Sequence, residues 1–225
     1  MKLYHNINDI EAGLDECARG TLFGRIYAAA VIWPTYKYTD DPYIDKIMDS
    51  KKLSSEQRDK LVEYIKNMAI DYHISWIEPD VIDKINILEA NMKVFHQCID
   101  GLKIRPTKLL VDGNRFKFYA PQVHHMNKNQ PTTRISNKSN NVISHVCVVK
   151  GDNKYISIAA ASILAKVYHD RYILDLCNKY PKLKEYDLEN NMGYGTKKHL
   201  DAIKKLSLTQ YHRKTFGICQ KYKAN

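Results

Sequence analysis

Short apolar runs separated by polar segments predict five β-strands. The run Ile26–Trp33 is nearly all apolar, which is typical of a strand buried on both faces. Leu14-Asp15 predicts the end of a strand just before it, and Tyr72–Ile77, Lys108–Val111 and Val142–Val149 predict three more. The first two strands follow each other without a helix between them, whereas the later strands alternate with helices. This order predicts an α/β fold with a mixed sheet.

Helical periodicity predicts four helices. The capping box Ser54-x-x-Gln57 marks the start of the first, and Pro79-Asp80 opens a second that Gly101 ends. Ile156–Leu176 predicts a long third helix and Lys197–Leu206 a short fourth one. Apolar positions at helical spacing predict the buried faces of the first two helices: Leu61, Val62, Ile65 and Met68 in the first, and Ile85, Leu88, Met92, Phe95 and Ile99 in the second.

The length of 225 residues suits one domain. We expect a single domain over residues 1–225, with the polar stretch 117–141 as an inserted loop and about residues 180–225 as a helical C-terminal part. No apolar run approaches the roughly 20 residues of a membrane span, and the polar start is unlike a signal peptide. Five scattered cysteines without a C-x-x-C pair fit a reducing compartment. These features predict a cytoplasmic monomer that does not bind membranes.

Lysine and arginine outnumber aspartate and glutamate by 35 to 25, which gives a formal net charge of +10. Such a balance favours a polyanionic partner such as nucleic acid or an acidic membrane surface. Composition alone is equally compatible with a basic protein that has no specific polyanionic partner. The charge therefore indicates nucleic acid only in combination with a suitable site.

Carboxylates stand at the ends of three apolar runs. They are Asp15-Glu16, Asp112 and Asp152, each beside a glycine or a turn. In open α/β sheets the carboxyl ends of strands line the ligand crevice, so we expect these side chains to gather there. Clustered carboxylates repel one another unless a hard divalent ion such as Mg²⁺ or Mn²⁺ neutralises them. A basic chain with acid in one cleft fits metal-dependent phosphodiester hydrolysis, although Asp-Gly is also a common turn dipeptide.

The two adjacent carboxylates Asp15 and Glu16 cannot both reach one site from a regular strand, because neighbouring strand residues point to opposite faces. One arrangement has Asp15 bridging the metal ions. Glu16 would then contribute from a twisted strand end or through its carbonyl group.

Further sequence blocks accompany these carboxylates. In chain order the blocks are Gly13–Gly20 (GLDECARG), Asp49–Leu53 (DSKKL), Val111–Arg115 (VDGNR), Lys150-Gly151-Asp152, Ser157–Val167 (SIAAASILAKV), Gly193-Tyr194 with downstream His199, and His212–Phe216 (HRKTF). In this order, over about residues 11–217, they resemble the ribonuclease HII family.

The resemblance implies a ribonuclease H-like fold, in which a mixed β-sheet is flanked by helices and followed by a C-terminal helical extension. It implies an endoribonuclease that hydrolyses the RNA strand of RNA–DNA hybrids. It also implies nicking of duplex DNA on the 5′ side of an embedded ribonucleotide, which leaves 3′-hydroxyl and 5′-phosphate ends. Two divalent ions, Mg²⁺ or Mn²⁺, are the implied cofactors, and these nucleic acids are the implied partners.

The same resemblance implies the residues of the site. Catalysis and metal binding would belong to Asp15, Glu16, Asp112 and Asp152. The stretch Ala18-Arg19-Gly20 would meet the ribonucleotide 2′-hydroxyl, largely through backbone groups, and such contacts can separate RNA from DNA. Tyr194 would stack on the sugar that follows the ribonucleotide and sense the RNA–DNA junction. Backbone phosphate would be bound by Ser50, Lys51 and Lys52.

Several positions leave alternatives open. Ala18 stands where the family usually has glycine, so a turn that needs a positive φ would be strained there and junction selectivity weakened. Asp170 competes with Asp152 as the fourth carboxylate, and we favour Asp152 because a charged helix residue usually faces solvent or a cation. Arg213 and Lys214 either keep the C-terminal tail soluble or contact phosphate.

Three other functions are compatible with parts of the pattern. A junction resolvase of the same fold shares the acidic cluster but needs neither a tyrosine junction sensor nor a 2′-hydroxyl contact. A ribonuclease HIII would carry an extra N-terminal substrate-binding domain, for which Asp15 lies too near the start. A basic nucleic-acid-binding module with a degenerate site would bind without cleaving, and the presence of all four carboxylates argues against it.

Overall fold

A five-stranded mixed sheet forms the centre of the computed structural model, which describes residues 1–36, 43–47, 53–119 and 142–222. Its strands are β1 (Glu11–Cys17), β2 (Ile26–Ile32), β3 (Asp71–Ile77), β4 (Lys108–Asp112) and β5 (Ser144–Val148), in the order β3-β2-β1-β4-β5. β1 pairs antiparallel with β2 and parallel with β4, and β5 runs parallel to β4. The predicted α/β fold with a mixed sheet is therefore confirmed.

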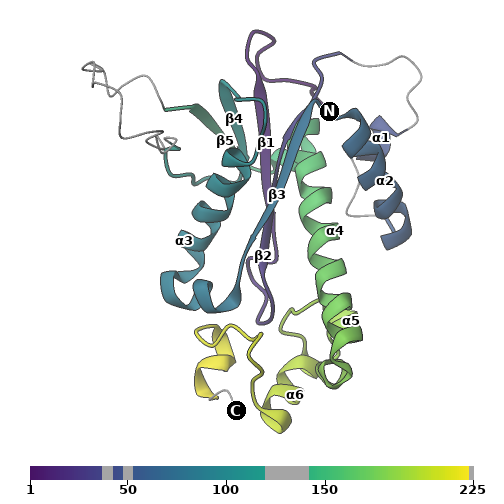
Figure 1. Cartoon of the computed structure of the whole chain (residues 1–225), viewed down its shortest axis with the longest axis vertical. Helices are drawn as coiled ribbons and strands as arrows, with labels where there is room; N and C mark the ends of the chain where they lie inside the picture. Colours follow the sequence, from purple (N-terminus) through teal and green to yellow (C-terminus); the bar gives the residue numbers. More distant parts are fainter. Residues whose placement is uncertain (37–42, 48–52, 120–141, 223–225) are drawn as a thin grey trace, which may run out of the picture.

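Helices cover both faces of this sheet (Figure 1). Helix α3 (Pro79–Asp100) packs on one face, and α4 (Ile156–Lys179) packs on the other together with α2 (Ser55–Met68) and the short α1 (Ile44–Ile47). Along β2, Ala28 and Ala30 face α3, while Ala29 faces α4. All three are fully buried, so the strand is enclosed on both sides as its apolar sequence predicts. No helix in the described ranges is both long and apolar enough to cross a membrane.

Local signals in the sequence explain where several helices begin. Ser54 and Gln57 form the expected reciprocal capping box at the start of α2. Thr196 caps the start of α6 (Lys197–Leu206), because its hydroxyl accepts a hydrogen bond from the His199 N–H. Both helices occupy the segments predicted from periodicity.

Helix α3 departs from the predicted buried face because it is broken at Asn86. This residue has φ 64° and ψ 166°, and its side-chain Oδ1 accepts hydrogen bonds from the N–H groups of Leu88 and Glu89 at 2.9 and 3.1 Å. Asn86 therefore acts as the N-cap of the second half of the helix. The break changes the helical phase, so the prediction that Leu88 is buried was wrong: it is 44% exposed.

The C-terminal part of the chain lies beyond one end of the sheet (Figure 1). It contains η3 (Pro181–Tyr186), α5 (Leu188–Asn191), α6 and η4 (Gly217–Lys221). Its apolar side chains form a third cluster with Leu22 and Phe23 from the β1–β2 connection. Backbone hydrogen bonds from Gly24 N–H to Tyr211 and from Arg213 N–H to Leu22 join the two segments. The C-terminal part is thus fastened to the connection that follows β1.

Candidate active site

The last residues of β1 carry two adjacent carboxylates on opposite faces of the sheet. Asp15 lies opposite Ala29 on the face covered by α4, and Ser162 of that helix hydrogen-bonds to its side chain. Glu16 lies toward α3 and lines a cavity together with Asn91. The Glu16 N–H also donates to Asp15 Oδ1 at 2.8 Å. The alternation expected for neighbouring strand residues is therefore present.

Asp112 ends β4, the parallel neighbour of β1. Its Oδ1 accepts a hydrogen bond of 2.6 Å from the N–H of Gly151, the first residue of η2 (Gly151–Asn153). This bond joins Asp112 to the segment that carries Asp152. Asp152 itself is half-buried, and its Oδ1 accepts from Asn153 Nδ2 at 3.1 Å.

Burial and mutual repulsion shift the ionisation of these carboxylates. Burial raises the pKa of Asp15 well above its ordinary value of 3.8, and the charges of Glu16 and Asp112 raise it further. Burial likewise raises the pKa of Glu16, and the Arg19 guanidinium only partly opposes this effect from a distance of 3.7 Å. Both directions indicate acid groups that lack sufficient neutralising charge.

The donor chemistry of Asp15, Glu16 and Asp112 suits a hard divalent cation, because all three offer oxygen ligands and repel one another without one. Within the described ranges, no three Asp, Glu, His or Cys side chains form a ready-made metal-binding group. The fit to a divalent ion therefore rests on donor type and electrostatics.

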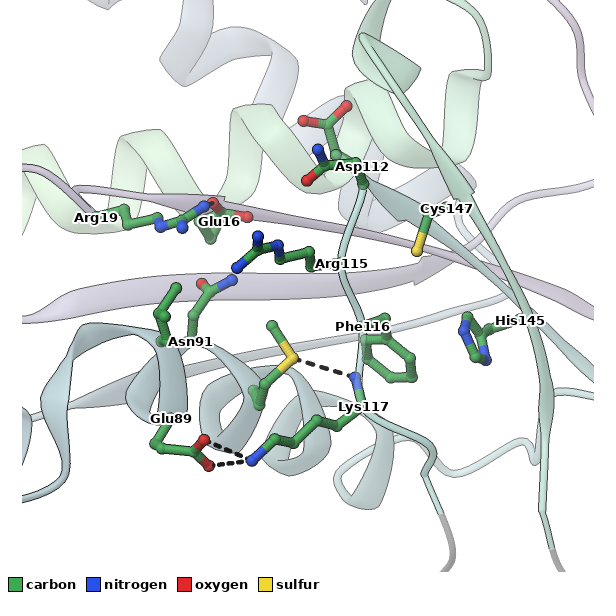
Figure 2. Close-up of a pocket in the computed structure, with 14 residues that line it drawn as sticks. Glu16, Arg19, Glu89, Asn91, Asp112, Arg115, Phe116, Lys117, His145 and Cys147 are labelled. Atoms are coloured by element: carbon green, nitrogen blue, oxygen red, sulfur yellow. Dashed lines mark hydrogen bonds and ion pairs between the residues drawn. The ribbon is translucent and has the colours of Figure 1, made fainter.

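A cavity of about 610 Å³ opens beside Glu16 and Asp112. Figure 2 shows the Arg115 guanidinium extending toward Glu16 and Asn91, with Arg19 close to Glu16. Phe116 and His145 line the cavity farther along, where their rings lie 5.0 Å apart. Acidic and basic groups therefore share one open space, which suits a polyanion held next to clustered carboxylates.

A second cavity, of about 400 Å³, shares Glu16 and Arg19 with the first. Its other lining residues include Cys17, Ala18, Gly20, Arg58, Lys166 and Tyr194. The structure thus brings the 18–20 turn and Tyr194 together beside Glu16, as the sequence resemblance implies.

Ala18 adopts the left-handed backbone conformation, with φ 68°, and is buried. An L-residue with a side chain pays roughly 1–2 kcal/mol for this conformation, so the turn is strained where glycine would be relaxed. Thr21 holds the turn, because its hydroxyl and its N–H both donate to the Ala18 carbonyl, at 3.1 and 3.5 Å. The strain expected at Ala18 is therefore present, and the turn still forms.

Arg213, from the C-terminal part of the chain, hydrogen-bonds to the 18–20 turn. Its side chain is fully buried, and it donates from Nη1 to the Arg19 carbonyl at 3.2 Å and from Nε to the Gly24 carbonyl at 2.9 Å. Burial lowers the pKa of Arg213 to about 10. The C=O and N–H of one trans peptide point in opposite directions, so the Gly20 N–H points away from Arg213. Neither proposed role of Arg213 from the sequence was right: it serves neither tail solubility nor phosphate contact.

The N–H groups of Arg19 and Gly20 have no hydrogen-bond acceptor among the described residues. Both belong to peptides whose carbonyls are held by the protein, by Thr21 in one case and Arg213 in the other. Two free backbone donors next to a positive-φ residue form the kind of concave site that binds an oxygen ligand.

Tyr194 lies at the rim of the second cavity with its side chain 42% exposed. The preceding Gly193 has φ +84°, and a Cβ atom there would lie 2.8 Å from the Phe23 carbonyl oxygen. The Gly193 carbonyl accepts a hydrogen bond of 2.8 Å from the Leu22 N–H. Glycine is therefore required for the loop to lie this close to the β1–β2 connection.

The negative charge of Asp170 on α4 is already paired with neighbouring side chains. Burial acts to raise its pKa, but hydrogen bonds from His169 and from Lys166, the latter 2.8 Å long, outweigh burial and lower the pKa. This arrangement is the ordinary helix ion pair expected for a competing carboxylate. Burial raises the pKa of the Cys17 thiol to about 12, which fits a packed side chain and not a reactive one.

Sequence reasoning assigned no role to Asn91, Arg58 or Arg115, although all three line the cavities. Asn91 is buried among apolar positions of α3. A polar residue on an otherwise apolar helix face was therefore the sequence signal that could have marked Asn91 as a site residue. The predicted phosphate contacts Ser50, Lys51 and Lys52, and residues 120–141 of the predicted insertion, lie outside the described residues.

Comparison with known proteins identifies the family of this chain. A family model described as Ribonuclease HII matches residues 12–219. A curated ribonuclease HII from Phocaeicola vulgatus is 44% identical over 215 residues, which cover 96% of this chain and 92% of the relative.

Two solved structures share the fold. The ribonuclease H2 from Pyrococcus horikoshii OT3 aligns with a TM-score of 0.67 at 24% identity, covering 94% of this chain and 95% of that chain. Bst-RNase HIII in complex with Mn²⁺ aligns with a TM-score of 0.57 at 18% identity, covering 94% and 68%. The chain therefore belongs to the ribonuclease HII family of metal-dependent nucleases, which cleave the RNA strand of RNA–DNA hybrids.

Proposed function

We propose that this protein also nicks duplex DNA on the 5′ side of a single embedded ribonucleotide, leaving 3′-hydroxyl and 5′-phosphate ends. The observation that carries the proposal is that two neighbouring cavities are both lined by Glu16. One cavity contains the carboxylates Glu16 and Asp112. The other contains Tyr194 and the 18–20 turn, whose Arg19 and Gly20 N–H groups have no acceptor in the described part of the chain. The 18–20 turn and Tyr194, which would recognise one ribonucleotide, therefore lie next to the carboxylates suited to hydrolysis.

Asp15, Glu16, Asp112 and Asp152 are the proposed ligands of two divalent ions, Mg²⁺ or Mn²⁺. Such ions, when bound, supply an activated water and stabilise the departing 3′ oxygen. The protein orients the ligands: Asp112 is fixed by the Gly151 N–H, and that bond keeps the Asp152 segment beside it. Asp152 is preferred to Asp170 as the fourth ligand, because Asp170 is paired with Lys166 and His169.

The protein's own groups supply recognition of the substrate. The N–H groups of Arg19 and Gly20 are positioned to donate to a ribonucleotide 2′-hydroxyl, an oxygen that DNA lacks. Arg58, Lys166 and Arg115 place positive charge along the cavities where phosphates would lie. Ser50, Lys51 and Lys52 remain proposed phosphate contacts.

The decisive assay uses a labelled DNA duplex that carries one ribonucleotide. A continuous RNA–DNA hybrid and an all-DNA duplex are run beside it, with Mg²⁺, Mn²⁺ or a chelator. We expect a metal-dependent nick on the 5′ side of the ribonucleotide, cleavage of the hybrid, and no cleavage of DNA alone. Cleavage of the hybrid without any nick would show that the strained turn at Ala18 has lost junction recognition.

Tyr194→Ala is expected to reduce kcat/KM for the single-ribonucleotide duplex more than for the continuous hybrid. Loss of one aromatic stacking contact corresponds to roughly tenfold or more. Tyr180→Ala is the matched control, because Tyr180 is similarly exposed, at 39%, but lines neither cavity. Equal losses on the two substrates would remove Tyr194 from junction sensing.

The stabilising effect of a divalent ion is expected to increase with pH. The pKa values of Asp15 and Glu16 are raised in the folded protein, so without metal the folded state binds more protons than the unfolded state. Their contribution to stability is therefore present below their ordinary values of 3.8 and 4.5 and is lost as pH rises through the raised values. A cation binds the ionised carboxylates and offsets this loss.

Thermal unfolding checks this prediction. The Tm in Mg²⁺ minus the Tm in chelator, at constant ionic strength, should grow between about pH 5 and pH 8. Burial lowers the pKa of His212 to about 3, so buried histidines change the pH dependence of stability in the opposite direction. This contribution is the same with and without Mg²⁺, so it cancels in the difference between the two Tm values. A difference independent of pH would argue against ion binding at Asp15 and Glu16.

A further inference from the structure

Two buried histidines connect Tyr194 to the C-terminal segment. His199 Nδ1 lies 2.9 Å from the Tyr194 carbonyl oxygen, and His199 Nε2 lies 3.2 Å from His212 Nε2. His212 Nδ1 lies 3.0 Å from the backbone N of Thr209. Both side chains are buried, with 0% and 1% exposed. The line of contacts from Thr209 to Tyr194 is therefore closed to solvent.

Only one arrangement of protons satisfies all these contacts. The Thr209 N–H can only donate, so His212 Nδ1 must accept and the proton of neutral His212 lies on Nε2. His212 Nε2–H then donates to His199 Nε2, which leaves the proton of neutral His199 on Nδ1. That proton is donated to the Tyr194 carbonyl, which can only accept. Every polar atom in the line has a partner.

Both histidines remain neutral in this arrangement. Burial lowers the pKa of His199, and burial together with His199 lowers that of His212. The charged groups near the pair are few: Asp187 acts on His199 and raises its pKa, which burial outweighs. A second proton on His199 would set two N–H groups against each other at the 3.2 Å contact with His212, and a second proton on His212 would face the Thr209 N–H at 3.0 Å.

His212 also contacts the β1–β2 connection just after the 18–20 turn. The His212 ring packs edge-on against Phe23 at a centroid distance of 5.0 Å, and the Phe23 carbonyl lies against Gly193. The Tyr194 carbonyl accepts a second hydrogen bond, from Thr196 N–H, but that bond only closes a local turn. Beside the Leu22 N–H bond to the Gly193 carbonyl, the histidine pair is thus a second connection between the Tyr194 loop and the segment that holds the 18–20 turn.

We infer that His199 and His212 are positioning residues for ribonucleotide recognition: His212 holds His199 in the tautomer with its proton on Nδ1, and that N–H fixes the Tyr194 backbone and thereby the place of its ring beside the 18–20 turn. The inference rests on the proposed role of Tyr194 at the RNA–DNA junction. Neither histidine lines the cavities, so neither touches substrate directly.

Two substitutions of His199 separate its hydrogen bond to Tyr194 from its contact with His212. The amide nitrogen of asparagine occupies nearly the position of Nδ1, so His199→Asn can still donate to the Tyr194 carbonyl. The amide of glutamine reaches instead toward Nε2, so His199→Gln keeps a contact with His212 and loses the bond to Tyr194. The variants are compared by their ratio of kcat/KM on the single-ribonucleotide duplex to kcat/KM on the hybrid.

We expect His199→Gln to lower this ratio about tenfold, the size of one lost hydrogen bond, and His199→Asn to keep it within about twofold. In a Tyr194→Ala background His199→Gln should lower the ratio no further, because its effect passes through Tyr194. An unchanged ratio in His199→Gln, equal effects of the two variants, or additivity with Tyr194→Ala would overturn the inference.

A measurement on the unaltered protein covers the case in which His199→Gln does not fold. Imidazole ¹⁵N shifts should show a protonated Nδ1 in His199 and a protonated Nε2 in His212, and the opposite tautomers would overturn the inference. If the wild-type protein cleaves hybrid but does not nick the single-ribonucleotide duplex, the proposed function fails. If it nicks, and Tyr194→Ala lowers the ratio while His199→Gln does not, the inference alone fails.

Discussion

Replacing Asp112 by asparagine is expected to lower kcat by about 10³-fold or more while leaving substrate binding nearly unchanged. Asparagine keeps the shape of the side chain and an Oδ1 that can accept the 2.6 Å hydrogen bond from Gly151. It removes one negative charge from the group formed with Asp15 and Glu16. The variant should therefore fold, and its defect should appear in single-turnover cleavage rather than in the Kd for a labelled hybrid.

Asp80→Asn provides the matched control for this experiment. Asp80 lies in the first turn of α3, is exposed, and pairs with Lys84 at 3.0 Å. The same chemical change at this position should leave cleavage within about twofold, because an exposed ion pair contributes little. If purified Asp112→Asn retains the wild-type rate, the assignment of the acidic cluster as the catalytic centre is wrong.

Gly13→Ala is expected to destabilise the protein by about 3 kcal/mol or more, because it overpacks a backbone-to-backbone contact. Gly13 lies in β1 two residues before Asp15, where the strand packs on the start of α4. A Cβ atom there would lie 2.4 Å from both the Ile158 nitrogen and the Ser157 carbonyl carbon. Backbone atoms cannot rotate aside as a side chain can, so strand and helix would have to separate.

Urea unfolding followed by circular dichroism measures this effect. Gly20→Ala is the control for stability, because a Cβ atom at Gly20 would meet nothing within 4 Å. We expect the midpoint to fall for Gly13→Ala and to stay close to wild type for Gly20→Ala. Similar midpoints for both variants would contradict the close packing of β1 on α4.

Elements with strong local signals could be predicted from the sequence. The capping box at Ser54 and the periodicity of Lys197–Leu206 located two helices, because caps and apolar spacing act within a few residues. The break at Asn86 was missed, because asparagine is compatible with a continuous helix and takes a positive φ only where packing favours it. The exposure of Leu88 follows from that break.

The candidate site was only partly accessible from sequence. Runs ending in Asp15-Glu16 and Asp112 indicated carboxylates at strand ends, because strand alternation and sheet topology follow general rules. Asn91 and Arg58 reach the cavities from α3 and α2, and nothing in their local sequence indicates which surface those helices turn toward the site.

Sequence patterns alone predict the alternation of strands and helices, the glycines that permit close approach, and the acidic residues proposed for catalysis. These features depend on the chemistry of neighbouring residues. The contacts of Arg213 and of the two histidines, in contrast, become visible only in the folded chain. Arg213 meets the Arg19 carbonyl across 194 positions of chain, and His199 meets His212 between separate segments. Such contacts form because burial forces each polar group to find a partner, and the folded chain decides which partner is within reach.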